Sequence, residues 1–218
     1  MKRETFQTTN LILRRSSQER DGEIFFQMLQ ETGNDDFRMF TGVDCYGSFL
    51  YNFEDYFEDH DDRYFYSLFL KSEAERFIGY AGFHRGYSSQ DYRSRYEIEF
   101  YIAKEYRGFG YAEEAARVLM DAFFHQEIMA NSSENSELWA KTLSRNNACI
   151  RLLEKLGFQK TGEGTVAEMS DFVDWDDEES CEDLVSEFLY QPSNLKSRVR
   201  FPLPALSAEQ MNAETVLK

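Results

Sequence analysis

The chain has 218 residues, of which 42% are hydrophobic and 16% aromatic, and its formal net charge is −16. This composition excludes a disordered chain, and the length is sufficient for one domain with a full hydrophobic core. The negative charge disfavours nucleic acid and anionic membranes as partners and favours a cationic one.

The chain carries no sign of membrane insertion or secretion. No apolar run approaches the roughly 20 residues that span a bilayer, and residues 1–7 lack the apolar segment of a signal peptide. Cys45, Cys149 and Cys181 are an odd number without metal-binding spacing, which is typical of free thiols in a reducing compartment. The sequence therefore predicts a cytoplasmic protein without a metal site.

In chain order, the first predicted elements are a strand and two helices. Residues 11–14 are apolar and compatible with a β-strand. Residues 16–19 can cap a helix that continues to about residue 30, and an aromatic-rich helix is predicted at about residues 47–57. The apolar face of the first helix would comprise Ile24, Phe25, Met28 and Leu29.

A strand pair follows. Residues 64–70 form an apolar run, residues 71–75 resemble a hairpin turn, and residues 76–83 form the partner strand. Gly79 and Gly82 inside that strand indicate a bulge or a close backbone approach. The remaining predicted elements are a polar loop at 86–94, strands at 96–102, 137–141, 158–161 and 184–190, and helices at 112–124 and 146–156, the last stopped by Gly157.

The most informative segment is Arg-Gly-Phe-Gly-Tyr-Ala at residues 107–112, between the strand at 96–102 and the helix at 112–124. Glycines let an anion approach the backbone closely, and the first N–H groups of a helix have no partner inside it. Arg107 adds a fixed positive charge. The segment therefore predicts a phosphate-binding site, and the alternative is a tight turn without a ligand.

Two motifs in order give this segment a family context. The pattern Arg-x-x-Gly-x-Ala resembles the Gln/Arg-x-x-Gly-x-Gly/Ala signature of the GNAT N-acetyltransferase superfamily, and it differs from a Walker P-loop and from a dinucleotide fingerprint. Residues 146–158 resemble the family's Asn-x-x-Ser helix that ends in Glu-Lys-x-Gly-Phe. Residues 8–14 resemble the opening strand of the RimJ/RimL-type branch, which contains ribosomal-protein N-terminal acetyltransferases and spermidine acetyltransferases. Together the resemblance spans about residues 8–190.

This resemblance implies an α/β (α+β) fold of the GNAT type. Its central sheet would be mixed and mostly antiparallel, with about six to seven strands, a splayed parallel central pair and about four flanking helices. The catalytic domain would occupy residues 1–190, with an acidic loop at about 165–183 that is longer than usual for the family. Residues 191–218 would form a C-terminal extension that could wrap the domain or pair with a second subunit in a homodimer.

The resemblance also implies acetyl transfer from acetyl-CoA to a primary amine, which attacks the thioester directly in a ternary complex. The backbone near Ile102 would pair with the pantetheine arm of the cosubstrate. Asn146 fits a helix cap and, by resemblance, a cofactor contact. The pyrophosphate would be held by the turn residues Arg107, Gly108, Phe109, Gly110, Tyr111 and Ala112.

Candidates for the catalytic base are Glu97 and Glu99, because residues i and i+2 of a strand point to the same face. Partial burial among apolar neighbours would raise the pKa of such a carboxylate, which suits a base near neutral pH. The alternative is a pair of ordinary solvated glutamates at the rim. His60, His84 and His125 are scattered along the chain and predict neither a zinc site nor a histidine-based triad.

Two positions depart from the family pattern. Leu153 occupies the place of the tyrosine that many members use to protonate the leaving thiolate. Cys149 occupies the Ser position and is expected to be a small packed residue, since a thiol is a weak hydrogen-bond donor. Ser144 and Tyr111 are the remaining hydroxyl donors nearby in sequence. A GNAT-fold protein that binds CoA or a partner without turnover is therefore an alternative to the enzyme.

Acidic residues concentrate at 54–62 and between residues 171 and 183. One interpretation is a solvated face or a mobile acidic loop. The other is that these clusters attract a cationic acceptor, which would be a small amine, a polyamine or a basic peptide N-terminus.

Overall fold

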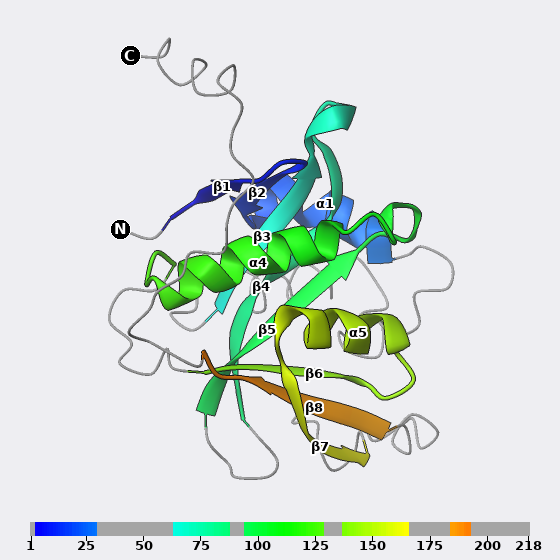
Figure 1. Cartoon of the computed structure of the whole chain (residues 1–218). Coiled ribbons are helices and arrows are strands. Elements are labelled where there is room, and N and C mark those ends of the chain that lie inside the picture. The colour runs from blue at the N-terminus through cyan, green and yellow to red at the C-terminus, as the bar shows by residue number, and fades with distance from the viewer. Residues whose placement is uncertain (1–2, 30–62, 88–93, 129–136, 166–183, 193–218) are drawn as a thin grey trace.

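The computed structural model describes residues 3–29, 63–87, 94–128, 137–165 and 184–192. Within them lie one eight-stranded sheet and three α-helices (Figure 1). The strands are β1 (Thr5–Gln7), β2 (Leu11–Arg15), β3 (Arg63–Leu70), β4 (Arg76–Tyr87), β5 (Ser94–Ile102), β6 (Leu138–Leu143), β7 (Gln159–Thr165) and β8 (Leu184–Tyr190). The helices are α1 (Gln18–Leu29), α4 (Tyr111–Phe124) and α5 (Asn147–Leu156), with short 3₁₀ turns η1 (Lys71–Glu73) and η2 (Lys104–Tyr106).

The strands follow the order β1-β2-β3-β4-β5-β6-β8-β7. Every neighbouring pair is antiparallel except β5 and β6, which are parallel. This confirms the predicted mixed, mostly antiparallel sheet with a parallel central pair. The sheet has eight strands in place of about six to seven, because the short β1 was not predicted. The helix expected at 47–57 lies outside the described residues.

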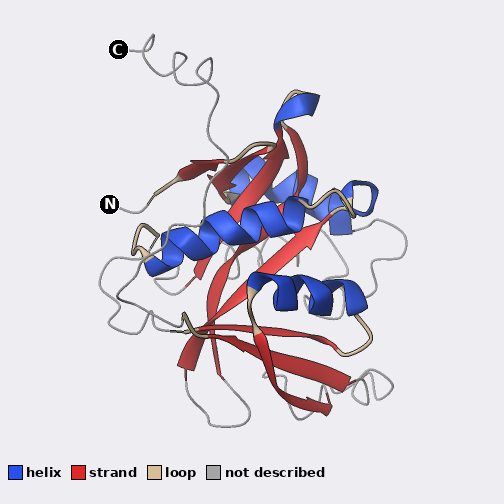
Figure 2. Ribbon diagram, in the orientation of Figure 1, coloured by secondary structure: helices blue, strands red, loops and turns tan. Residues whose placement is uncertain are grey.

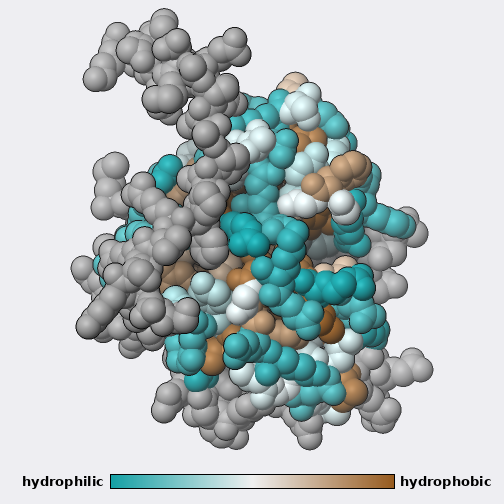
Figure 3. All heavy atoms as spheres, in the orientation of Figure 1, coloured by the Kyte–Doolittle hydropathy of each residue, from teal (hydrophilic) through white to brown (hydrophobic). Residues whose placement is uncertain are grey.

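Helices cover both faces of the sheet. α4 and α5 lie on one face and α1 on the other (Figures 1 and 2). The α4 side holds the larger core, in which Leu119 and Phe123 pack with Phe83 and Ile98 of the sheet. The α1 side holds a smaller, aromatic core made of Phe25, Met28, Phe65, Phe69, Phe77, Tyr80 and Ala103. On the face shown in Figure 3, hydrophilic residues dominate the surface over α4 and α5, as amphipathic helices require.

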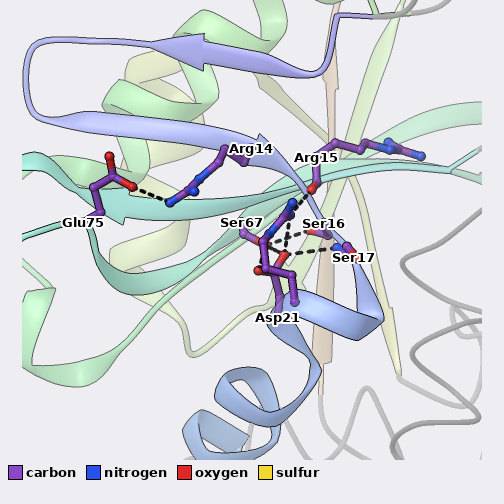
Figure 4. A network of polar contacts seen from close by, with 8 residues as sticks. Arg14, Arg15, Ser16, Ser17, Asp21, Ser67 and Glu75 are labelled. Atoms are coloured by element: carbon purple, nitrogen blue, oxygen red, sulfur yellow. Dashed lines mark hydrogen bonds and ion pairs between the residues drawn. The ribbon is translucent and has the colours of Figure 1, made fainter.

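The start of α1 is fixed by a buried carboxylate, that of Asp21 (Figure 4). Its Oδ2 accepts hydrogen bonds from the Ser17 backbone N–H at 3.0 Å and from the Ser67 hydroxyl at 2.6 Å. Arg20 donates to both carboxylate oxygens, at 2.9 and 2.8 Å, and also to the carbonyl of Arg15. The predicted helix start is therefore correct, and it is tied to the middle of β3.

The predicted apolar face of α1 was partly wrong. Phe25 and Met28 are buried as expected, but Ile24 is 41% exposed. The reason is that α1 packs on the sheet through one narrow stripe, and Ile24 lies beside that stripe. No helix in the described part of the chain is long and apolar enough to cross a membrane.

Candidate active site

The parallel strands β5 and β6 touch at one point. Their ladder contains one register pair, Glu97 with Trp139. Beyond it the strands diverge (Figure 1), because β5 continues beside β4 to Ile102 while β6 continues beside β8 to Leu143. In the described chain, the edge of β5 that faces β6 therefore has no strand partner after Glu97. Such an edge can pair with an extended ligand through its backbone groups.

Gly79 allows β4 and the end of β5 to approach closely. The register between β3 and β4 shifts at Leu68/Phe69, opposite the backbone of Gly79, whose φ is +152°. A Cβ atom at Gly79 would lie 2.0 Å from the carbonyl oxygen of Tyr101, and one at Gly82 would lie 2.3 Å from that of Tyr64. The predicted bulge and close approach at these glycines are confirmed.

The glycine turn leads from β5 into α4. Gly108 and Gly110 have φ values of +84° and +87°, which glycine adopts readily. The Glu114 N–H bonds to the Gly110 carbonyl, so the preceding N–H groups have no acceptor inside the helix. A Cβ atom at either glycine would meet no heavy atom within 4 Å. The turn therefore offers exposed backbone donors beside open space, which fits a phosphate group.

The other turn residues frame this space. The Arg107 side chain lies with its guanidinium carbon 5.3 Å from the centre of the Tyr101 ring and is hydrogen-bonded to the carbonyl of Ile102. Phe109 is 68% exposed and stacks on Tyr111, with ring centroids 5.8 Å apart. The predicted residues Ile102 and 107–112 thus lie along one connection, from the last residue of β5 to the first turn of α4.

The first turn of α4 contains two acidic residues, Glu113 and Glu114, which would repel a bound phosphate. Both carboxylates form ion pairs or hydrogen bonds with other residues. Glu113 pairs with Lys155 of α5 at 2.5 Å and with Arg117 at 3.0 Å. Desolvation raises the pKa of Glu113, but the hydrogen bonds from Lys155 and Arg117 outweigh it and leave that pKa lowered. Glu114 accepts two hydrogen bonds from Asn10, at 2.7 and 2.9 Å. Lys155 is therefore paired with Glu113.

The start of α5 confirms the predicted cap. The Oδ1 atom of Asn146 accepts from the N–H of Cys149 at 3.2 Å. Burial raises the pKa of the Cys149 thiol, and a hydrogen bond with Thr142 offsets this in part. Leu153, at the position of the family's tyrosine, is 1% exposed in the main core. Both departures from the family pattern are therefore packed positions.

The two predicted base candidates, Glu97 and Glu99, lie beside His84. The sequence alone did not predict this proximity. Glu97 and Glu99 lie on the α1 side of β5, with side chains 13% and 26% exposed. The Nε2 atom of His84 is 3.9 Å from Oε2 of Glu97 and 3.7 Å from Oε2 of Glu99. The hydroxyl of Tyr80 donates to Oε1 of Glu99 at 2.6 Å. The sequence signal was the strand pair itself, since antiparallel pairing of β4 and β5 sets His84 directly opposite Glu97.

The remaining candidate donors have other contacts. The Ser144 hydroxyl bonds to Glu163 at 2.9 Å and to the Ser186 hydroxyl at 2.7 Å. Tyr111 stacks on Phe109. The acidic clusters at 54–62 and 171–183, His60, Cys45 and Cys181 all lie outside the described residues.

Comparison with known structures shows the same fold in several acetyltransferases. A GNAT-family acetyltransferase from Bacillus anthracis superposes with a TM-score of 0.62 at 15% identity, covering 86% of this chain and 98% of that one. A RimL ribosomal L7/L12 α-N-protein acetyltransferase in complex with coenzyme A gives 0.63 at 11% identity, covering 86% and 98%. The acetyl transferase from Salmonella typhimurium that modifies the N-terminal serine of L7/L12 gives 0.64 at 12%, covering 85% and 96%.

Sequence comparison gives the family directly. No curated protein matches this chain. Residues 10–159 match the family described as "Acetyltransferase (GNAT) domain", and this segment is more than half of the 218 residues. It contains the β5–β6 divergence, the glycine turn and the Asn146 cap. The chain therefore belongs to the GNAT acetyltransferase family.

Proposed function

We propose that the protein transfers an acetyl group from acetyl-CoA to a cationic primary amine, which attacks the thioester directly in a ternary complex. One observation carries the proposal: strand β5 bears Glu97 and Glu99 on one face and leads at its end into the open glycine turn. Residues that could bind and deprotonate an amine are thereby connected through the end of β5 to residues that could bind a phosphate.

Bound acetyl-CoA supplies the activated acetyl thioester. Gly108, Gly110 and the first N–H groups of α4 would hold its pyrophosphate, with Arg107, Phe109, Tyr111 and Ala112 in the same turn. The unpaired edge of β5 towards Ile102 would hold the pantetheine arm, and Asn146 would contact the cofactor from the start of α5.

Charge supports a cationic acceptor. The chain carries a formal charge of −16, and Glu97 and Glu99 place two carboxylates together near the point where β5 and β6 meet. The similar Salmonella protein modifies the N-terminal serine of a ribosomal protein, so a peptide N-terminus is one candidate, beside polyamines and other small amines. The acidic protein would be expected to act in the cytoplasm, where such acceptors occur.

The experiment is a thiol-release assay with acetyl-CoA and a panel of spermidine, an aminoglycoside, basic N-terminal peptides and a neutral amine of similar size. We expect the cationic acceptors to have the highest kcat/KM, and their advantage to shrink as salt shortens the screening length to about 8 Å at physiological ionic strength. A neutral or acidic amine that is best at every salt concentration would overturn the cationic assignment.

A second candidate function is CoA binding without turnover, and one observation supports it. Leu153 is a buried core residue where many family members carry a donor tyrosine, so this chain lacks that acid. The same assay separates the two proposals, because CoA binding by calorimetry without thiol release from any acceptor supports the second.

A further inference from the structure

A cluster on the α1 side of the sheet comprises His84, Glu97, Glu99 and Tyr80. The proposed function gives roles to the two glutamates but none to His84. Within the cluster, one imidazole nitrogen lies between two carboxylates. From this arrangement, and resting on the proposed acetyl transfer, we propose that His84 accepts the proton of the acceptor ammonium group, with Glu97 and Glu99 as its flanking carboxylates.

The backbone places these side chains in one row. Antiparallel pairing sets Arg63 of β3, His84 of β4 and Glu97 of β5 directly opposite one another, and Glu97 is also the residue paired with Trp139 of β6. His84 is therefore next to the point where β5 and β6 begin to diverge.

Neighbouring groups fix the geometry of the cluster. The His84 ring lies nearly parallel to that of Phe65, at 19° with centroids 6.2 Å apart. A Cβ atom at Gly86 would lie 3.2 Å from Oε2 of Glu97. Glycine at this position therefore avoids a close contact with the carboxylate. Glu99 is held by the Tyr80 hydroxyl. The imidazole and both carboxylates are thus positioned from three adjacent strands.

The chemistry favours the imidazole as the proton acceptor. Imidazole is the side-chain group that enzymes use most often to accept a proton from a reacting group. In the step, an N–H bond of the ammonium breaks, an Nε2–H bond forms, and the nitrogen keeps its electron pair as a neutral amine. The imidazolium then carries the positive charge, 3.7–3.9 Å from the two carboxylates that had faced the ammonium.

Other charged groups also lie on this side of the sheet. Arg63 lies opposite His84, and Arg95, two residues before Glu97, forms an ion pair with Glu137 at 3.0 Å. From α1, the packed residues on this face are the apolar Phe25 and Met28 and the buried carboxylate of Asp21, which is bonded to Arg20 and Ser67. The carboxylates of Glu97 and Glu99 both lie within ion-pair distance of the His84 ring.

The test uses His84→Gln and His84→Ala in the full-length protein, with spermidine as the acceptor. His125→Gln is the matched control, because His125 also lies beside a carboxylate, that of Asp121 at 3.3 Å, but at the C-terminal end of α4. We expect His84→Gln to lower kcat at least tenfold and to change the shape of the pH–rate profile. Added imidazole should restore part of the activity of His84→Ala, and acetyl-CoA affinity by calorimetry should stay unchanged.

His125→Gln should keep the wild-type rate and profile. Wild-type turnover that persists with an unchanged pH profile in His84→Gln would overturn this inference alone and leave a glutamate as the base. Absence of turnover in the wild-type protein with every acceptor would overturn the proposed function, and this inference with it.

Discussion

The Nε atom of Arg107 donates a hydrogen bond to the carbonyl oxygen of Ile102, 2.8 Å away. This bond links the first residue of the glycine turn to the last residue of β5. The carbonyl belongs to the residue whose backbone was expected to meet the pantetheine arm, so Arg107 has a structural role in addition to its charge. The bond connects the end of the strand to the start of the glycine turn.

The first prediction separates these two roles. Arg107→Lys keeps the charge but lacks the planar guanidinium that can bond Ile102 and still present further donors. We expect it to weaken CoA binding about three- to tenfold, in line with one lost hydrogen bond of about 0.5–1.5 kcal/mol, with calorimetry as the measurement. Lys104→Met, which removes a charge from the η2 turn, serves as the control. Wild-type affinity in Arg107→Lys would mean that the charge alone matters.

The second prediction concerns Gly110. Its φ of +87° costs a residue with a side chain about 1–2 kcal/mol, yet a Cβ atom there would contact nothing in the protein. Gly110→Ala should therefore lower stability by about that amount, while Gly110→Val should abolish CoA binding because its side chain fills the space kept for phosphate. Urea unfolding and calorimetry measure the two effects separately. CoA binding by Gly110→Val at wild-type affinity would remove the turn from the cofactor site.

The third prediction concerns the buried carboxylate of Asp21. Asp21→Asn keeps the shape of the side chain but loses the charge-assisted hydrogen bonds with Arg20, so we expect the free energy of unfolding to fall by about 1–3 kcal/mol. Denaturant unfolding at neutral pH measures this. Glu19→Gln, an exposed change in the same helical turn, should stay within about 0.5 kcal/mol of the wild type. An equal effect of both substitutions would contradict the role given to the network in Figure 4.

The fourth prediction is a pH dependence at the β6–β8–β7 edge. Hydrogen bonds from Lys160, Ser144 and Ser186 lower the pKa of Glu163 from 4.5 to about 2. Because the folded-state pKa is the lower one, the stabilisation by Glu163 is fully present above about pH 4.5 and is lost as the pH falls towards 2. The difference in Tm between the wild type and Glu163→Gln should therefore shrink across that window.

Glu154→Gln, an exposed charge removal on α5, controls for general charge effects in this measurement. If the Tm difference caused by Glu163→Gln stays constant from pH 5 to pH 2.5, the three hydrogen bonds do not stabilise the ionised form of Glu163.

Elements with local signals were predictable from the sequence. α5 begins at the Asn146 cap and ends at Gly157, and the glycine turn precedes α4, because each boundary requires a residue type that the sequence shows. β1 was missed for the opposite reason. It has three residues, of which Phe6 alone is buried, and its strand character comes from pairing with β2.

The candidate site was predictable only in part. The turn was predictable from its glycine motif, and the two glutamates were predictable from the alternation of side chains along their strand. The position of His84 depends on the register between β4 and β5. This register pairs His84 with Glu97, which lies 13 residues later in the sequence. The engagement of Glu113 by Lys155 likewise depends on how α4 and α5 pack. Such relationships between distant residues have no signature in a single sequence.

The position of β8 bears on the order in which the chain can fold during synthesis. β8 is the last described strand to be translated, yet it lies between β6 and β7 and pairs with both. A nascent chain that ends before residue 184 can form the glycine turn and α4, but its β6 and β7 still expose unpaired edges to other chains. The half of the sheet that borders β6 is therefore completed only after β8 has been made, so a chain still in synthesis contains the whole glycine turn before its sheet can be finished.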